Sequence, residues 1–206
     1  GNNSGNIVNL NNLHLSSANT VFVNNNDWTI SGNLQVENGQ LNVSSTSSFT
    51  LLSNALTTAQ ILPSVENSLI GDFTIERFIS SRNANYANFS SPMVSATVNE
   101  LDDDLSLSGI GGVSGNATAS GGGIFFSIKK YNRFSEAHEN VTSTTAVLEP
   151  GNGYEIYLAS TLSTFNATTV DLVGTPTTGE LSSTQVNQGW NLIGNPYQSS
   201  LSWTNV

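Results

Sequence analysis

Apolar residues in the first quarter of the chain occur in short pairs, with one residue between the two members of each pair. A period of two places both members on the same face of a β-strand. The first members of successive pairs are 8, 7, 6, 7 and 8 residues apart, and Asn, Ser and Gly are frequent in the intervals. The pattern predicts six short strands, at Leu13/Leu15, Val21/Val23, Trp28/Ile30, Leu34/Val36, Leu41/Val43 and Phe49/Leu51.

The nearly constant interval favours a β-solenoid, in which short strands stack coil upon coil and each coil buries its inward side chains against the next. A meander of hairpins is the alternative, because Asn38-Gly39 would suit a two-residue hairpin turn. We favour the solenoid since the apolar runs are shorter than typical hairpin strands. In a solenoid, Trp28 points to the core, and His14 points outward because it lies between Leu13 and Leu15.

The pattern changes after residue 66. Rows of good helix formers at helical spacing do not appear anywhere, so the fold class is all-β. The wider spacing of the later strands favours a β-sandwich of the jelly-roll kind. We therefore expect a β-solenoid-like Asn/Ser-rich segment at 1–66, ending in a connector, and a β-sandwich module at 67–206. The longer strands are expected at 69–79, 86–94, 124–131, 153–159, 170–173 and 190–194.

Charge and cysteine content exclude several classes of function. Charged residues make up 10% of the chain, with 5 Lys and Arg against 15 Asp and Glu, and the net charge is -10. A basic face for nucleic acid or for an anionic membrane surface could hardly be assembled from so few cations. The absence of cysteine excludes disulfides and thiolate metal sites. The apolar runs are too short for a membrane span.

A series of short motifs lies between residue 70 and the end of the chain. They are Thr74-Ile75-Glu76-Arg77-Phe78-Ile79, Asn88-Phe89-Ser90-Ser91-Pro92-Met93, Gly151-Asn152-Gly153-Tyr154, Val173-Gly174-Thr175-Pro176 with Thr178-Gly179, and Gly189-Trp190-Asn191-Leu192-Ile193-Gly194-Asn195-Pro196-Tyr197. In this order they resemble motifs of secreted cell-surface proteins of the Bacteroidetes, the last being the most specific. Leu201-Ser202-Trp203 is similar to the continuation of that last motif, with Ser202 in place of the usual Asp.

The resemblance implies a large exported protein with a sorting domain for type IX secretion beyond Val206. We interpret the chain as a piece of such a protein, truncated at the end of its second module. Proteins of this kind include gliding and attachment adhesins, and also multidomain enzymes that carry such modules as accessories. The resemblance supplies no catalytic residue, so we expect no enzyme activity. It places the chain outside the cell, with glycans or surfaces and other domains of the same long chain as partners.

The acidic run gives one candidate metal site. Ca²⁺ takes six to eight oxygen ligands and tolerates irregular geometry, and extracellular β-proteins often bind it through loop carboxylates. Asp102, Asp103 and Asp104 are the candidate ligands, and Ca²⁺ is the one cofactor that the sequence suggests. No established calcium-loop motif is present, so a solvated acidic loop is the simpler interpretation.

Aromatic residues give a candidate glycan site. Sugar rings stack on exposed aromatic faces beside Asn and Asp side chains, and Tyr197, Trp203 and Tyr154 are the residues that we select. Trp190 lies in an expected strand and is interpreted as a core residue. Glu76 and Arg77 alternate sides on one strand, and the inward one is expected to form a structural ion pair.

Two functions are consistent with these features. The first is a non-enzymatic structural and adhesive module of a large secreted bacterial surface protein. The alternative is a carbohydrate-binding accessory module of a secreted polysaccharide-degrading enzyme, which predicts an exposed aromatic residue beside carboxylates.

Overall fold

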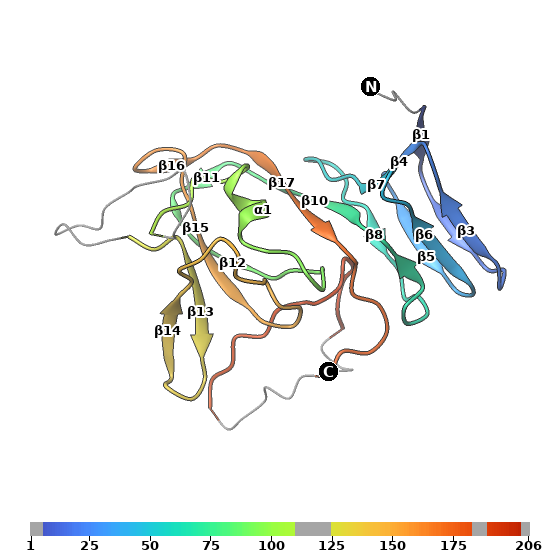
Figure 1. Cartoon of the computed structure of the whole chain (residues 1–206). Helices are drawn as coiled ribbons and strands as arrows, with labels where there is room; N and C mark the ends of the chain where they lie inside the picture. Colours follow the sequence, from blue (N-terminus) through green and yellow to red (C-terminus); the bar gives the residue numbers. More distant parts are fainter. Residues whose placement is uncertain (1–5, 110–124, 183–188, 203–206) are drawn as a thin grey trace.

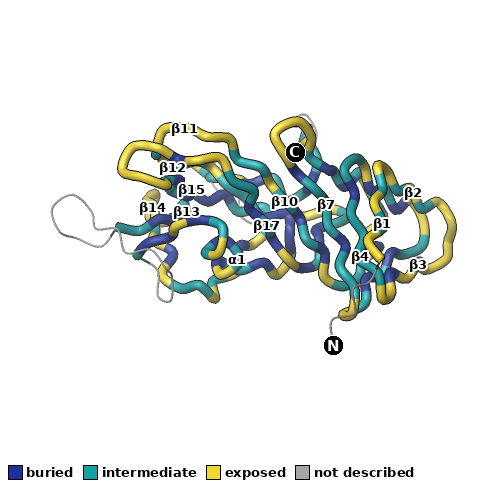
Figure 2. Tube along the Cα trace, turned by 90° about the horizontal axis from the view of Figure 1, so that it is seen from above, coloured by how far each residue is buried: buried dark blue, intermediate teal, exposed yellow. Residues whose placement is uncertain are grey.

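The computed structural model describes residues 6–109, 125–182 and 189–202. The molecule is elongated, with a stack of short strands at one end and the hairpin of β13 (Ile128–Asn132) and β14 (Ala137–Asn140) at the other (Figures 1 and 2). The glycine-rich stretch 106–123, whose composition predicts a mobile loop, lies mostly outside the described residues.

The stack is a β-solenoid of three coils with three strands in each coil. Strands of successive coils pair in parallel, for example Val8 with Trp28, and Val21 with Leu41. A hairpin meander would pair them antiparallel, so the solenoid interpretation is confirmed and all six predicted strands are present. The coils are β1 (Ile7–Leu10), β2 (Leu13–Leu15) and β3 (Thr20–Val23); β4 (Asp27–Ile30), β5 (Asn33–Val36) and β6 (Gln40–Val43); and β7 (Ser48–Leu51), β8 (Gln60–Ile61) and β9 (Leu69–Ile70).

Burial differs between the coils. In the second coil the inward Leu34, Val36 and Leu41 are fully buried, whereas the corresponding Leu13 of the first coil is only half-buried. A middle coil is covered on both sides, but the first coil has a neighbour on one side within the described structure (Figure 2). Trp28 is half-buried and stacks on Phe49 at 6.2 Å between ring centroids.

The Asn38-Gly39 pair forms a corner of the second coil. Gly39 has φ +75°, and a Cβ there would lie 2.2 Å from the carbonyl oxygen of Asn19 in the coil below. Only glycine combines that backbone conformation with such a close approach. The sequence that suits a hairpin turn therefore serves as a corner between strands of two different sheets.

The solenoid passes without a break into the second part of the chain. Its third coil includes β9 and so extends beyond residue 66, and the next strand, β10 (Phe73–Ile79), pairs in parallel with β7. The other edge of β10 pairs antiparallel with β17 (Thr168–Gly174), which completes a five-stranded sheet in the order β1-β4-β7-β10-β17. The stretch expected as one strand at 69–79 is split at Gly71, which has φ +94°.

The rest of the second part is antiparallel. A four-stranded sheet has the order β12-β15-β13-β14, and β11 pairs with β16. The expected strand at 190–194 is reduced to one bridge between Asn152 and Ile193. His138, for which the sequence predicts a loop or a single helical turn, lies in a strand. The elements are β11 (Arg82–Asn83), β12 (Asn85–Phe89), α1 (Asn99–Asp102), β13 (Ile128–Asn132), β14 (Ala137–Asn140), β15 (Tyr154–Leu158) and β16 (Thr164–Phe165).

Candidate ligand-binding cleft

The two glycine-containing motifs of the second part contact each other. Gly153 donates its N–H to the carbonyl of Leu192 at 3.1 Å, and Gly194 donates to the carbonyl of Gly151 at 2.9 Å. A Cβ on Gly153 would lie 2.5 Å from Cγ of Leu192, and one on Gly194 would lie 2.4 Å from the carbonyl oxygen of Asn152. Both glycines are therefore required by the close approach of two chain segments, which is a structural role.

The other motifs take part in the same packing. The Ser90 hydroxyl donates to the carbonyl of Asn195 at 2.9 Å, and Thr177 donates its N–H to the carbonyl of Pro92 at 2.8 Å. The Asn195 side chain closes a turn, because its Oδ1 accepts from the Tyr197 N–H at 3.0 Å. Motif residues far apart in the chain thus hold one another in place.

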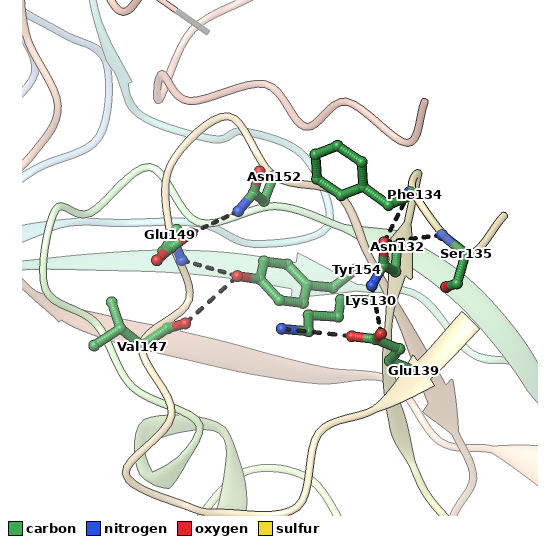
Figure 3. Close-up of polar contacts among 9 residues, drawn as sticks. All are labelled: Lys130, Asn132, Phe134, Ser135, Glu139, Val147, Glu149, Asn152 and Tyr154. Atoms are coloured by element: carbon green, nitrogen blue, oxygen red, sulfur yellow. Dashed lines mark hydrogen bonds and ion pairs between the residues drawn. The ribbon is translucent and has the colours of Figure 1, made fainter. Parts of the chain in front are cut away.

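The paired motif segments form one wall of a cleft of about 230 Å³. The opposite wall is the hairpin β13–β14, and Figure 3 shows the polar contacts around it. We call this site the hairpin cleft. Its lining residues are Lys130, Tyr131, Asn132, Arg133, Phe134, Glu139, Glu149, Gly151, Asn152, Gly153, Asn191, Leu192 and Ile193.

The hairpin wall is held by Asn132. Its Oδ1 accepts from the N–H groups of Phe134 at 2.8 Å and Ser135 at 3.3 Å, which shapes the turn between the strands (Figure 3). Its Nδ2 donates to the Glu139 carboxylate, which also pairs with Nζ of Lys130 at 3.8 Å. These contacts fix an amide, a carboxylate and an ammonium group side by side.

The motif wall is held by Glu149 and Tyr154. The Glu149 carboxylate accepts from Nδ2 of Asn152 at 2.7 Å, and the Tyr154 hydroxyl accepts from the Glu149 N–H at 2.9 Å (Figure 3). Burial raises the pKa of Tyr154 above its ordinary value, so the hydroxyl stays neutral. The ring of Tyr154 is 4% exposed and packs in the core, where it positions the wall.

Two exposed aromatic residues belong to the segments that form the cleft. Phe134, at the tip of the hairpin, is 75% exposed, and Trp190, next in the chain to the lining residue Asn191, is 85% exposed. The expectation that Trp190 is a core residue is wrong, because the strand assumed to bury it does not form. We did not select Phe134 from the sequence as a candidate binding residue. The signal that could have found it is Asn132, a residue type that is common in turns, two positions earlier in the chain.

The remaining residues of the expected glycan site lie elsewhere. The Tyr197 hydroxyl donates to the carbonyl of Gly179 at 2.8 Å and accepts from the N–H of Leu181 at 3.1 Å. These two hydrogen bonds hold the backbone around residue 180 in place. Tyr197 does not line the hairpin cleft, and Trp203 lies outside the described residues.

The acidic run forms α1 and the turn after it. The Asp104 carboxylate accepts from the N–H of Asp171 at 2.9 Å, and the Glu100 carboxylate accepts from the N–H of Val173 at 2.7 Å. Both carboxylates thereby hold α1 against β17. Within the described ranges, no group of three or more His, Asp or Glu side chains is arranged to hold a metal ion, and calcium binding by Asp102, Asp103 and Asp104 stays a prediction.

The geometry of the hairpin cleft is suited to binding. Amide, carboxylate and ammonium groups line it together with the exposed Phe134. None of the helices in the described part of the chain is long and apolar enough to cross a membrane. Comparison with known proteins gave no match to a family model, a curated protein or a solved structure.

Proposed function

We propose that the chain is a non-enzymatic structural and adhesive module of a large secreted bacterial surface protein, as its motifs imply. The observation that carries this proposal is the single sheet β1-β4-β7-β10-β17, which joins the solenoid to the second part by backbone hydrogen bonds. A solenoid fused in this way transmits load without a flexible linker. That property suits a stalk displayed outside a cell.

The second part is proposed to be a β-sandwich of the jelly-roll kind. The pair β10–β17 and the pair β12–β15 supply residues to the walls of one cavity, which supports two facing layers. The contacts among the motifs also support a structural module, because the motif residues serve packing and turns.

Deletion of this segment from the parent protein tests the adhesive function. Bacteria that carry the deletion should attach to surfaces less well than the parent strain, with equal amounts of both proteins on the cell surface. A matched strain carrying Leu162→Ala, a change at a fully exposed position, serves as control. Normal attachment and movement of the deletion strain would contradict the adhesive function.

The alternative, a carbohydrate-binding accessory module, is favoured by one observation. Phe134 is exposed and lines a cleft that also presents Glu139 and Glu149, and the exposed Trp190 directly precedes the lining residue Asn191. Aromatic faces beside hydrogen-bonding groups are the common means of holding sugar rings. In this function the hairpin cleft is the sugar site.

A glycan array separates the two functions. Binding of neutral glycans that is lost in the double variant Phe134→Ala/Trp190→Ala and retained in Leu162→Ala supports the accessory module. All three positions are exposed, so the substitutions leave the core intact. An array with no signal for the unchanged protein would rule out the sugar site in the hairpin cleft.

A further inference from the structure

Arg77 occupies a position where the strand pattern places core residues. Along β10, Phe73 and Ile75 are buried, and Arg77 is the next residue in the same row. Its partner across the pairing with β17 is Val170, which is also buried. A guanidinium group therefore replaces an apolar side chain in the row that faces inward, and it stays exposed because a cavity opens there.

The cavity has a volume of about 360 Å³ and lies between the pairs β10–β17 and β12–β15. This volume is at the lower end of the range for small-molecule sites, about 300–1,000 Å³. Its lining includes aliphatic side chains such as Ile75, Ile156 and Leu172, together with Arg77 and Arg82. We call this site the arginine cavity.

A second, polar cavity of about 220 Å³ adjoins the first. The two share Arg77, Asn195 and Gln198 as lining residues. Hydroxyl and amide groups of the third solenoid coil and of the chain near residue 200 complete the second cavity. These groups belong to Thr58, Gln60, Ser199 and Ser200.

Within the described residues, no ion pair neutralises the positive charge of the arginine cavity. Of the five Lys and Arg residues, Lys130 pairs with Glu139, Lys129 lies over the ring of Tyr86, and Arg133 lies over the ring of Phe134. The described part of the structure shows no ion pair for Arg77 or Arg82. The expected structural ion pair is therefore not formed, and Glu76 instead accepts from the N–H of Ser53 at 2.9 Å.

All 15 Asp and Glu residues of the chain lie within the described ranges. In a protein of net charge -10, two of the five cations thus line one cavity, and neither forms an ion pair within the described ranges. The guanidinium groups in this arrangement are available to bind an anionic ligand.

We propose that the arginine cavity binds the carboxylate of an acidic sugar, namely a hexuronic acid residue within an oligosaccharide. A planar carboxylate matches the guanidinium group in two parallel hydrogen bonds. The aliphatic wall suits the C–H face of the sugar ring, and the adjoining polar cavity suits the hydroxyl groups of a neighbouring sugar. The site is separate from the hairpin cleft and does not depend on it.

Titration calorimetry with trigalacturonate tests this site. The control ligand is the same trisaccharide with all of its carboxylates methyl-esterified, which carries no charge. Trigalacturonate should bind at least about tenfold more tightly than the ester, and its affinity should fall as salt screens the charges. Arg77→Gln and Arg82→Gln should each weaken binding, with the larger loss of about tenfold or more for Arg77. Lys129→Gln removes the same charge outside the cavity and should bind as the unchanged protein does.

Several results would overturn the assignment. They are equal affinity for the acid and the ester, no binding of trigalacturonate, or unchanged affinity in Arg77→Gln/Arg82→Gln. Acetate that competes as well as trigalacturonate would show that the sugar ring contributes nothing. Phe134→Ala/Trp190→Ala should retain trigalacturonate binding, so that failure of the hairpin cleft and failure of the arginine cavity are told apart. Melting curves of every variant establish that it is folded.

Discussion

The carboxylate of Asp104 lies against the backbone of Asp171, whose N–H it accepts at 2.9 Å. The contact brings two acidic residues together, and both are half-buried. Burial, followed by the negative charges of Asp104 and Asp103, raises the pKa of Asp171 from 3.8 to about 6. Burial also raises the pKa of Asp104. The protonated form of Asp171 is thus favoured by folding.

The first prediction is a pH dependence of stability that originates at Asp171. A group whose pKa is higher in the folded state stabilises the fold most below its unfolded pKa, and the stabilisation is lost as pH rises through its folded pKa. This contribution should therefore fall between pH 3.8 and about 6. Asp171→Asn should raise Tm at neutral pH and reduce the dependence in this window. Asp72→Asn, at an exposed position, is the control. An identical pH profile in Asp171→Asn would contradict the prediction.

The second prediction compares Leu34 and Leu13, which face each other in register across β5 and β2. Leu34 is fully buried, so Leu34→Ala should cost about 2–5 kcal/mol of the free energy of unfolding. Leu13→Ala should cost less than half as much, because Leu13 is only half-buried. Denaturant unfolding of the two variants measures the difference. Equal losses would mean that the first coil is as well covered as the second.

The third prediction concerns a charge inside the solenoid. Val36 is fully buried, and Val36→Asp should open the second coil because an unpaired buried charge costs several kcal/mol. Gln35→Asp puts the same charge on the adjacent outward-facing residue and should change stability little. Thermal unfolding followed by circular dichroism measures both. A melting transition that is unchanged in Val36→Asp would show that the position tolerates water.

The fourth prediction concerns the bridge between the motifs. Gly194→Ala should destabilise the protein by about 1–3 kcal/mol, because the new methyl group would meet the Asn152 carbonyl and Cβ of Ser90. Hydrogen exchange should quicken at the N–H groups of Gly153 and Gly194, which donate across the bridge. Ser200→Ala, an exposed change in the same segment, is the control. Unchanged exchange at both groups would contradict the structural role of the motif.

Some of the fold could be predicted from the sequence because the signals are local. The alternation of Leu34, Gln35 and Val36 specifies which side chains share a face, whatever the strand later pairs with. The repeat interval and short runs then favour stacking over hairpins. The same reasoning failed at Trp190, where a local apolar pattern has no neighbouring strand to bury it.

The candidate sites were less predictable because they depend on distant segments. The hairpin cleft needs the chain at Gly153 to pair with the chain at Gly194, and their 41-residue separation leaves no periodic signal. The arginine cavity needs β10 and β15 to supply facing walls. Of the expected glycan residues, Tyr197 and Tyr154 are used for backbone contacts that only the folded chain creates.

The sequence by itself determined the all-β character, the solenoid and the inward rows of each coil. These follow from the period of side chains along one strand and from the spacing of turns, which are properties of neighbouring residues. Tertiary structure decided that β10 continues the solenoid sheet, that Trp190 is exposed and that Arg77 lines a cavity in which the described residues supply no ion-pair partner for it. Those outcomes depend on which distant strands pair and on what space remains between them, and the chain acquires both only when it folds.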